Sequence, residues 1–201
     1  MEFKKIQLNG FKSFAEKTNF LIEDGLTGIV GPNGCGKSNI VESLRWAMGE
    51  TSAKSMRGSG MEDVIFSGTS NKASKNIAEV SIVVDNASHE GPFQYKDVDQ
   101  IEVRRKIEKD KGSKFYINNK EVRARDAQMF FADLSTGAHS PSMISQGRIG
   151  ALVTAKPTDR RAILEEAANI SGLHVRRHEA ELRLNAAETN LKRADELRRQ
   201  Q

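Results

Sequence analysis

Alternating apolar and polar residues mark several short segments in the N-terminal part of the chain. Because every second side chain of a strand points to the same face, this alternation predicts strands with one buried face. The predicted strands cover residues 3–8, 19–22, 78–85 and 101–107, and a short apolar run predicts another at 26–30. Two further strands, at 115–117 and 121–122, flank Asn118 and Asn119, a pair that favours the tight turn of a hairpin.

A different spacing predicts helices in two places. Apolar residues recur at three- and four-residue intervals over residues 37–48, and Gly49 is suited to end this helix. After Pro157, Thr158 and Asp159 are suited to the N-cap of a second helix. A heptad pattern follows, with position a at Ile170, Arg177, Leu184, Leu191 and Arg198 and position d at Leu173, Ala180, Ala187 and Ala194. It predicts the start of a coiled coil, with an ordinary amphipathic surface helix as the alternative.

These patterns divide the chain into two parts. Every Phe, Tyr and Trp lies at or before Phe131, whereas the C-terminal segment is aliphatic, alanine-rich and charged. We therefore predict an α/β lobe over residues 1–157, with a curved sheet around the helix at 37–48. A helical arm is predicted over residues 158–201.

Composition narrows the cellular setting. Cys35 is the single cysteine, so an internal disulfide is excluded and a reducing compartment is expected. The sequence contains neither the apolar core of a signal peptide nor a run of about 18 apolar residues. These features predict a cytoplasmic protein. The chain carries 31 Lys and Arg against 27 Asp and Glu, a net charge of +4, which allows an anionic partner without requiring one.

Residues 31–38 carry the strongest chemical signal. They fit the pattern G-x-x-x-x-G-K-[ST] between a predicted strand and a predicted helix, a context that a plain glycine-rich turn would not require. In such a loop backbone N–H groups surround phosphates, the lysine neutralises the β- and γ-phosphates, and the hydroxyl binds Mg²⁺. The sequence therefore predicts a site for ATP with Mg²⁺. The predicted nucleotide-binding residues of this segment are Gly31, Pro32, Asn33, Gly34, Cys35, Gly36, Lys37, Ser38 and Asn39.

A complete hydrolytic site needs groups beyond this loop. Such ATPases use an Asp at a strand end for the metal and an acid or Gln that orients the attacking water. Asp85 ends a predicted strand, but Asn86 follows it where a cleaving site usually has an acid, and Asp-Asn is typical of a turn. The sequence therefore contains one half of a nucleotide site.

Several separate stretches resemble the N-terminal head segment of bacterial SMC (structural maintenance of chromosomes) proteins. They are residues 10–14, 31–50, 61–66, 144–147, 159–161 and 165–168, in the order that the family has. The resemblance implies a P-loop NTPase fold of the ABC/SMC type, split between the two ends of a long polypeptide. Residues 1–157 would form the N-terminal lobe of the ATPase head, and residues 158–201 the helical neck and the start of a coiled-coil arm.

The resemblance also implies roles for single residues. Gln146 matches the Q-loop glutamine, which binds Mg²⁺ and the attacking water; taken alone, it could equally be a polar turn residue. Arg57 is similar to the head arginine that reaches the nucleotide phosphates, with an exposed basic residue as the alternative. Lys12 and Ser13 resemble the loop that approaches the phosphates from the other side. Lys37, Gln146 and Arg57 are thus the catalytic candidates, and Ser38 and Gln146 the candidate metal ligands.

Partners follow from the same resemblance. It implies a C-terminal head segment, a homodimer of heads that encloses two ATP molecules, a kleisin with winged-helix subunits, and duplex DNA bound without sequence specificity. The protein would act at the nucleoid in chromosome condensation and segregation. Arg123 and Arg125 match the DNA-facing surface, and Arg104, Arg105 and Lys106 form a basic cluster on a neighbouring strand. A solvated strand edge is the alternative for these residues.

Other functions stay open at this point. One is a nucleotide-binding or coiled-coil module without turnover, and another is the head of a recombination or break-repair ATPase. The stretches 33–46 and 61–66 resemble chromosomal SMC proteins better than break-repair ATPases. A metabolic P-loop kinase would need an acceptor site and a lid, for which the sequence gives no convincing signal. Because the signature and the acids are missing, we expect this chain alone to bind ATP with little or no turnover.

Overall fold

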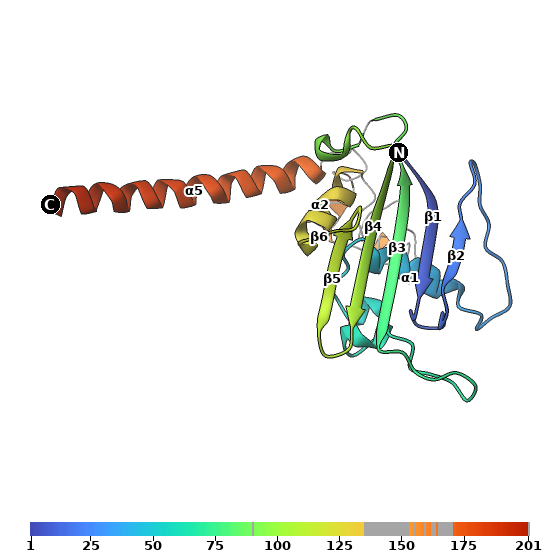
Figure 1. The fold of residues 1–201 in the computed structure, drawn as a ribbon. Helices are drawn as coiled ribbons and strands as arrows, with labels where there is room; N and C mark the ends of the chain where they lie inside the picture. Colours follow the sequence, from blue (N-terminus) through green and yellow to red (C-terminus); the bar gives the residue numbers. More distant parts are fainter. Residues whose placement is uncertain are drawn as a thin grey trace.

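A computed structural model describes residues 1–89, 91–134, 153–154, 156–158, 160–161, 164 and 171–200. Within them, one sheet with helices on one face forms a lobe, and a long helix projects from it (Figure 1). The α/β prediction for the lobe is therefore confirmed. The domain boundary predicted at residue 157 stays a prediction, because most residues between 135 and 170 lie outside the described ranges.

The sheet has six strands in the order β2-β1-β3-β4-β5-β6, and every neighbouring pair is antiparallel. The strands are β1 (Glu2–Asn9), β2 (Thr18–Leu21), β3 (Ile77–Asp85), β4 (Gln100–Glu108), β5 (Gly112–Ile117) and β6 (Lys120–Val122). Alternate residues of β4 are buried, as the pattern predicted. Six of the seven strands expected from the sequence are thus present.

The buried face of the sheet forms one hydrophobic core with α1 (Lys37–Ala47). α1 lies against β3 and β4, and the side chain of Trp46 is fully buried between the helix and the sheet. Gly49, at φ 105°, follows the last turn and lets the chain leave the helix in a conformation that other residues rarely adopt. The core therefore anchors the helix that follows the phosphate loop.

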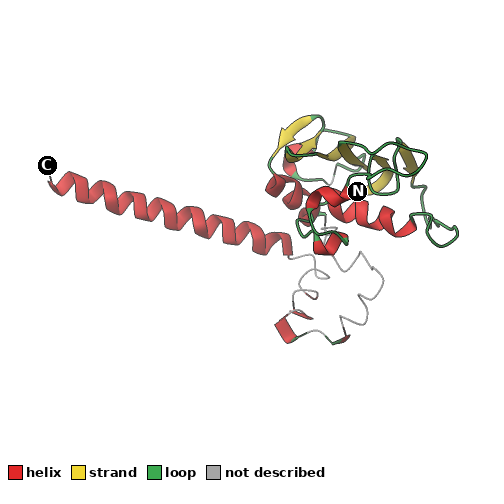
Figure 2. Cartoon of the chain, turned by 90° about the horizontal axis from the view of Figure 1, so that it is seen from below, coloured by secondary structure: helices red, strands yellow, loops and turns green. Residues whose placement is uncertain are grey.

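A hairpin and a helix complete the lobe. Asn118 and Asn119 have φ values of 47° and 65°, as the predicted tight turn between β5 and β6 requires. The helix α2 (Ala124–Asp133), which the sequence reasoning missed, follows directly and buries Ala127, Phe130 and Phe131. Figure 2 shows the helices of the lobe gathered along one face of the sheet. Three short 3₁₀ helices, η1 (Lys54–Met56), η2 (Met61–Val64) and η3 (Phe93–Tyr95), lie in the connections.

The strand predicted at residues 26–30 is wrong for this chain. The segment pairs with no described strand, and Leu26 and Val30 are almost fully exposed, at 101% and 94%. A short apolar run is typical of a strand buried on both faces, which needs neighbouring strands on either side. The described strands provide no such place, because the edge of their sheet next to this segment is β2 (Figure 1).

The arm is a single helix, α5 (Ser171–Gln200), of 30 residues. At about 1.5 Å per residue it extends for about 45 Å. Leu182, Leu184 and Leu191 are exposed along it, which is expected for a helix whose partner is not in the structure. The prediction of a helix is confirmed over residues 171–200, and its pairing in a coiled coil stays a prediction. Among the described residues, no helix combines the length and the apolar character that crossing a membrane requires.

Candidate functional site

The phosphate loop lies at the N-terminal end of α1. Gly34 and Gly36 have φ values of 85° and 93°, the left-handed conformation that favours glycine. Gly36 is the N-cap of α1, and no side-chain hydrogen bond caps the start of the helix. A side chain at Gly36 would also meet Ser13 Oγ at 2.5 Å. The loop therefore fits an anion such as a phosphate at a helix N-terminus.

Lys37 lies within this loop. Its Nζ donates hydrogen bonds to the carbonyls of Gly31, at 2.7 Å, and Pro32, at 2.6 Å. The same ammonium is 3.7 Å from the exposed thiol of Cys35. The lysine thus places a positive charge where the loop would surround phosphates, which is what a bound triphosphate needs.

A second loop approaches from the turn after β1. The amide of Asn39 donates a hydrogen bond to Ser13 Oγ at 2.9 Å, which ties this turn to the first turn of α1. Lys12 has a left-handed backbone, at φ 46°, and its N–H donates to the carbonyl of Val64 at 2.7 Å. The structure therefore brings Lys12, Ser13 and Asn39 together beside the phosphate loop.

Arg57 joins the same group through a residue that the sequence reasoning missed. Glu42, on the second turn of α1, is buried, and its Oε1 lies 2.7 Å from Arg57 Nε. Its Oε2 accepts a hydrogen bond from Lys12 Nζ. One signal was available: Glu42 is four residues after Ser38, so both lie on one face of the helix.

Of the two candidate metal ligands, the structure describes only Ser38. Ser38 is exposed in the first turn of α1, where its hydroxyl can bind a hard cation next to a phosphate. Gln146 lies outside the described residues, so its role stays a prediction. The donors and the loop geometry fit ATP with Mg²⁺, whose charge would polarise the γ-phosphate.

Asn86 serves the fold. Its side-chain amide donates hydrogen bonds to the carbonyls of Tyr95, at 2.9 Å, and Val98, at 2.7 Å, and the residue is fully buried. This arrangement agrees with a turn after β3 and leaves the amide occupied. The strand end at Asp85 and Asn86 therefore does not provide the missing half of a hydrolytic site.

The basic cluster on β4 needs a correction. Arg105 is 3% exposed, so it does not belong to a surface that contacts DNA. Its guanidinium lies 4.7 Å from the centre of the Phe115 ring, and its Nε donates to Ser113 Oγ at 2.7 Å. Burial lowers the pKa of Arg105 to about 10, so the group stays charged at neutral pH.

The remaining basic candidates lie at the hairpin end of the sheet. Arg104 is half-buried over the ring of Tyr116, at 4.8 Å, and donates to the Asn119 side chain at 3.3 Å. Arg123 and Arg125 are exposed where α2 begins. The three arginines therefore border one end of the lobe, where phosphates of a nucleic acid could approach.

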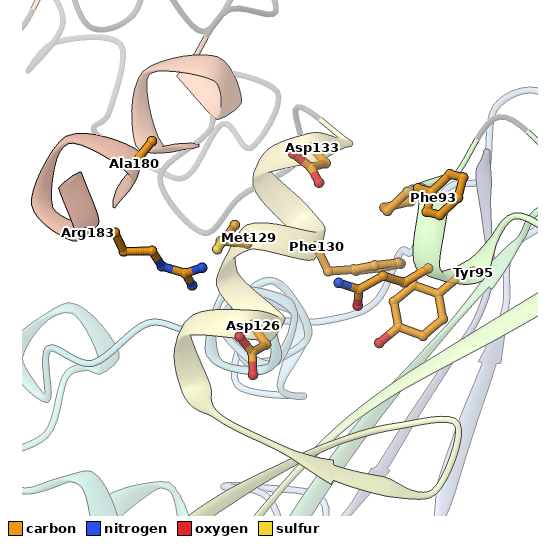
Figure 3. Close-up of a pocket in the computed structure, with 10 residues that line it drawn as sticks. Phe93, Tyr95, Asp126, Met129, Phe130, Asp133, Ala180 and Arg183 are labelled. Carbon is orange, nitrogen blue, oxygen red and sulfur yellow. The ribbon is translucent and has the colours of Figure 1, made fainter. Parts of the chain in front are cut away.

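A separate cavity of about 500 Å³ lies away from the phosphate loop (Figure 3). Residues of η3, α2 and α5 line it, among them Phe93, Tyr95, Met129 and Arg183. It contains none of the candidate nucleotide-binding residues. The candidate nucleotide site is therefore an exposed loop, and this cavity is separate from it.

The chain is similar to known proteins in sequence and in structure. The family model described as RecF/RecN/SMC N terminal domain matches residues 2–149. The "Chromosome partition protein Smc" of Cereibacter sphaeroides is 57% identical over 197 residues, which are 98% of this chain and 17% of that protein. The chain thus spans about a sixth of the length of the curated relatives it matches.

Two solved structures are similar as well. A chain described under "Structural biochemistry of ATP-driven dimerization and DNA stimulated activation of SMC ATPases" is 30% identical, with a TM-score of 0.71. The match covers 83% of this chain and 99% of that one. The Smc head domain of Pyrococcus furiosus, bound to the C-terminal domain of ScpA, has a TM-score of 0.78 at 30% identity, over 98% of this chain and 49% of that one.

Proposed function

The chain belongs to the RecF/RecN/SMC N-terminal domain family and is similar to the N-terminal head segment of bacterial SMC proteins, and from this premise we propose that it is the ATP-binding half of an SMC head. A C-terminal head segment and a second head would complete the site, and hydrolysis would drive chromosome condensation and segregation. The observation that carries the proposal is the phosphate loop, with Lys37 inside it and with Lys12, Ser13 and Arg57 gathered at its side.

The exposed segment at residues 26–30 supports a missing second half. Leu26 and Val30 present apolar side chains to solvent immediately before the phosphate loop. An apolar run of this kind is stable only when strands cover it, and a C-terminal head segment would provide them. The same segment would bring the signature and the acids that this chain lacks.

Each residue of the loop has a defined task in this proposal. The N–H groups at the start of α1 bind phosphate oxygens, and Lys37 exchanges its contacts with the loop carbonyls for contacts with the β- and γ-phosphates. Ser38 holds Mg²⁺, together with Gln146. Arg57 neutralises charge on the transferred phosphoryl group.

The partners of the relatives become expectations for this protein. Similar structures are described in terms of ATP-driven dimerization and DNA-stimulated activation of SMC ATPases, and of an Smc head bound to ScpA. We propose the corresponding partners here: a second head, duplex DNA through Arg123 and Arg125, and a kleisin with its winged-helix subunits. The protein would then act at the nucleoid in the cytoplasm.

The test is reconstitution. This chain is mixed with the C-terminal head segment of a close relative, and ATP hydrolysis is measured with and without duplex DNA. The proposal expects turnover by the mixture that neither part shows alone, and its loss with Lys37→Ile. If the mixture hydrolyses no more ATP than the variant, while the chain still binds ATP, the chain is a nucleotide-binding module without turnover.

A further inference from the structure

Glu42 connects two cations that the sequence placed on different loops. Its carboxylate accepts a hydrogen bond from Lys12 Nζ on one oxygen and lies 2.7 Å from Arg57 Nε on the other. The side chain of Glu42 is only 6% exposed, and that of Lys12 14%. Only Oε2 accepts a hydrogen bond, and the buried Oε1 is held to Arg57 by the ion pair alone. A buried carboxylate is costly unless cations pair with it, so Glu42 keeps Lys12 and Arg57 close to itself.

The contacts form a closed ring. Lys12 Nζ donates both to Glu42 and to the carbonyl of Met56, at 2.5 Å. Met56 directly precedes Arg57, whose backbone is held at φ 55°, and Arg57 returns to the other oxygen of Glu42. Three separate segments therefore meet at one carboxylate: the turn after β1, the helix α1 and the loop after η1.

The ring leaves one part of Arg57 available. Glu42 is contacted through Nε, and the side chain of Arg57 is still 63% exposed. Guanidinium groups offer further donors on their two terminal nitrogens, in a fixed plane. The ion pair at Nε therefore holds the guanidinium beside Glu42 and leaves the terminal nitrogens for an acceptor in solution.

The carboxylate is also close to the phosphate loop. Glu42 is one helical turn beyond Ser38, about 6 Å along the axis of α1. Asn39, between them, binds Ser13 of the same turn that carries Lys12. We propose that Glu42 is a positioning residue of the nucleotide site: Lys12 holds its carboxylate in place, and the carboxylate orients Arg57 toward a nucleotide phosphate. This inference rests on the proposed ATP site.

The sign of the effect separates this role from simple electrostatics. Glu42 is negative, so its loss should strengthen the binding of a negatively charged nucleotide if only charge mattered. If Glu42 orients Arg57, its loss should weaken binding, because the arginine no longer meets the phosphate in a fixed geometry. The two explanations predict opposite directions.

The experiment is a double-mutant cycle in this chain, read by titration with a fluorescent ATP analogue and Mg²⁺. We expect Glu42→Gln to weaken binding by about tenfold or more, the range for loss of a hydrogen bond between an arginine and a charged phosphate. Arg57→Ala should weaken binding by a similar factor. The double variant should be no weaker than Arg57→Ala alone, because Glu42 acts through Arg57. Unchanged or tighter binding by Glu42→Gln, or multiplicative losses in the double variant, overturns the proposal.

Two further variants keep the test decisive. Glu50→Gln removes another buried carboxylate at the far end of α1, where Glu50 binds Arg45 at 3.0 Å, and it should bind the analogue like the wild type. If Glu42→Gln does not fold, Arg57→Lys replaces it, since lysine keeps the charge but has a single nitrogen to share. Affinity near that of Arg57→Ala supports the proposal, and wild-type affinity overturns it. If the proposed ATP site itself were wrong, Lys37→Ile would bind the analogue as tightly as the wild type does. That result differs from every outcome expected for Glu42.

Discussion

The guanidinium of Arg105 lies 4.5 Å from the centre of the Trp46 ring, in the interior of the lobe. Its Nη1 donates hydrogen bonds to the carbonyls of Trp46 and Glu50, both at 2.7 Å. These carbonyls belong to the end of α1 and the residues just beyond it, where a helix leaves acceptors without partners and favours a positive charge. The arginine therefore fastens the helix of the phosphate loop to β4.

Replacement of this arginine should destabilise the lobe. Arg105→Met keeps much of the volume but leaves two buried carbonyls unsatisfied, so we expect the free energy of unfolding to fall by about 2–4 kcal/mol. Urea unfolding followed by circular dichroism measures this change. Lys109→Met, at an exposed position in the turn after β4, is the matched control and should change the value by less than about 0.5 kcal/mol. Equal stability of both variants would contradict the capping role.

Arg105 also shows where sequence reasoning was limited. The alternation along β4 places Arg105 on the same face as Val103 and Ile107, which is the buried face. Charge led to the opposite interpretation, because charged residues are rarely buried unless paired. The acceptors that satisfy this arginine come from α1, more than fifty residues away in sequence. The face of β4 on which Arg105 lies was thus predictable from the alternation, whereas the carbonyls that accept its hydrogen bonds were not.

The other differences have similar causes. The sheet, the hairpin and α1 follow from local spacing and turn residues, and they are confirmed. The segment at 26–30 has the composition of a buried strand, but none of the described strands pairs with it. Glu42 gave no local signal beyond its spacing from Ser38, because its role depends on Lys12 and Arg57, which come from distant loops. Contacts between distant segments are therefore what the sequence could not supply.

Asp63 should make the loop next to Arg57 sensitive to acid. Its carboxylate accepts hydrogen bonds from the N–H groups of Gly60, at 3.0 Å, and Ser59, at 2.6 Å, and from the Ser59 hydroxyl. These bonds favour the charged form and lower the pKa of Asp63 below 3.8. Because the pKa is lower in the folded state, the stabilisation is present above pH 3.8 and is lost as the pH falls through the folded-state pKa.

The variant Asp63→Asn tests this directly. We expect a lower melting temperature than the wild type at pH 7. The difference should shrink as the pH falls from 3.8 through the folded-state pKa, because the wild-type carboxyl then becomes protonated too. Thermal unfolding at pH 7, 5 and 3 measures it. Glu23→Gln, at an exposed acid outside the described strands and helices, is the control. A difference that is constant over this pH range would show that the charge of Asp63 contributes nothing.

The apolar residues before the phosphate loop should have opposite effects alone and in complex. Leu26→Ser and Val30→Ser remove exposed apolar surface, so the isolated chain should stay monomeric at higher concentration. If the proposed C-terminal head segment covers these residues, the same variants should bind it more weakly, by about tenfold or more. Light scattering and a binding titration measure the two effects. Phe93→Ser, which also removes exposed apolar surface but far from the loop, should improve solubility without weakening the complex.

DNA binding should depend on Arg123 and Arg125 through charge alone. Both are exposed where α2 begins, and side chains that neutralise phosphates release counterions, so affinity falls with salt. For the reconstituted head, the logarithm of the binding constant should fall linearly with the logarithm of salt concentration. Each of Arg123→Ala and Arg125→Ala should reduce the magnitude of this slope by about one, on duplexes of any sequence. Lys17→Ala removes an exposed charge next to β2, at the opposite edge of the sheet from β6, and should leave the slope unchanged. If the arginine variants keep the full slope, the DNA surface lies elsewhere on the head.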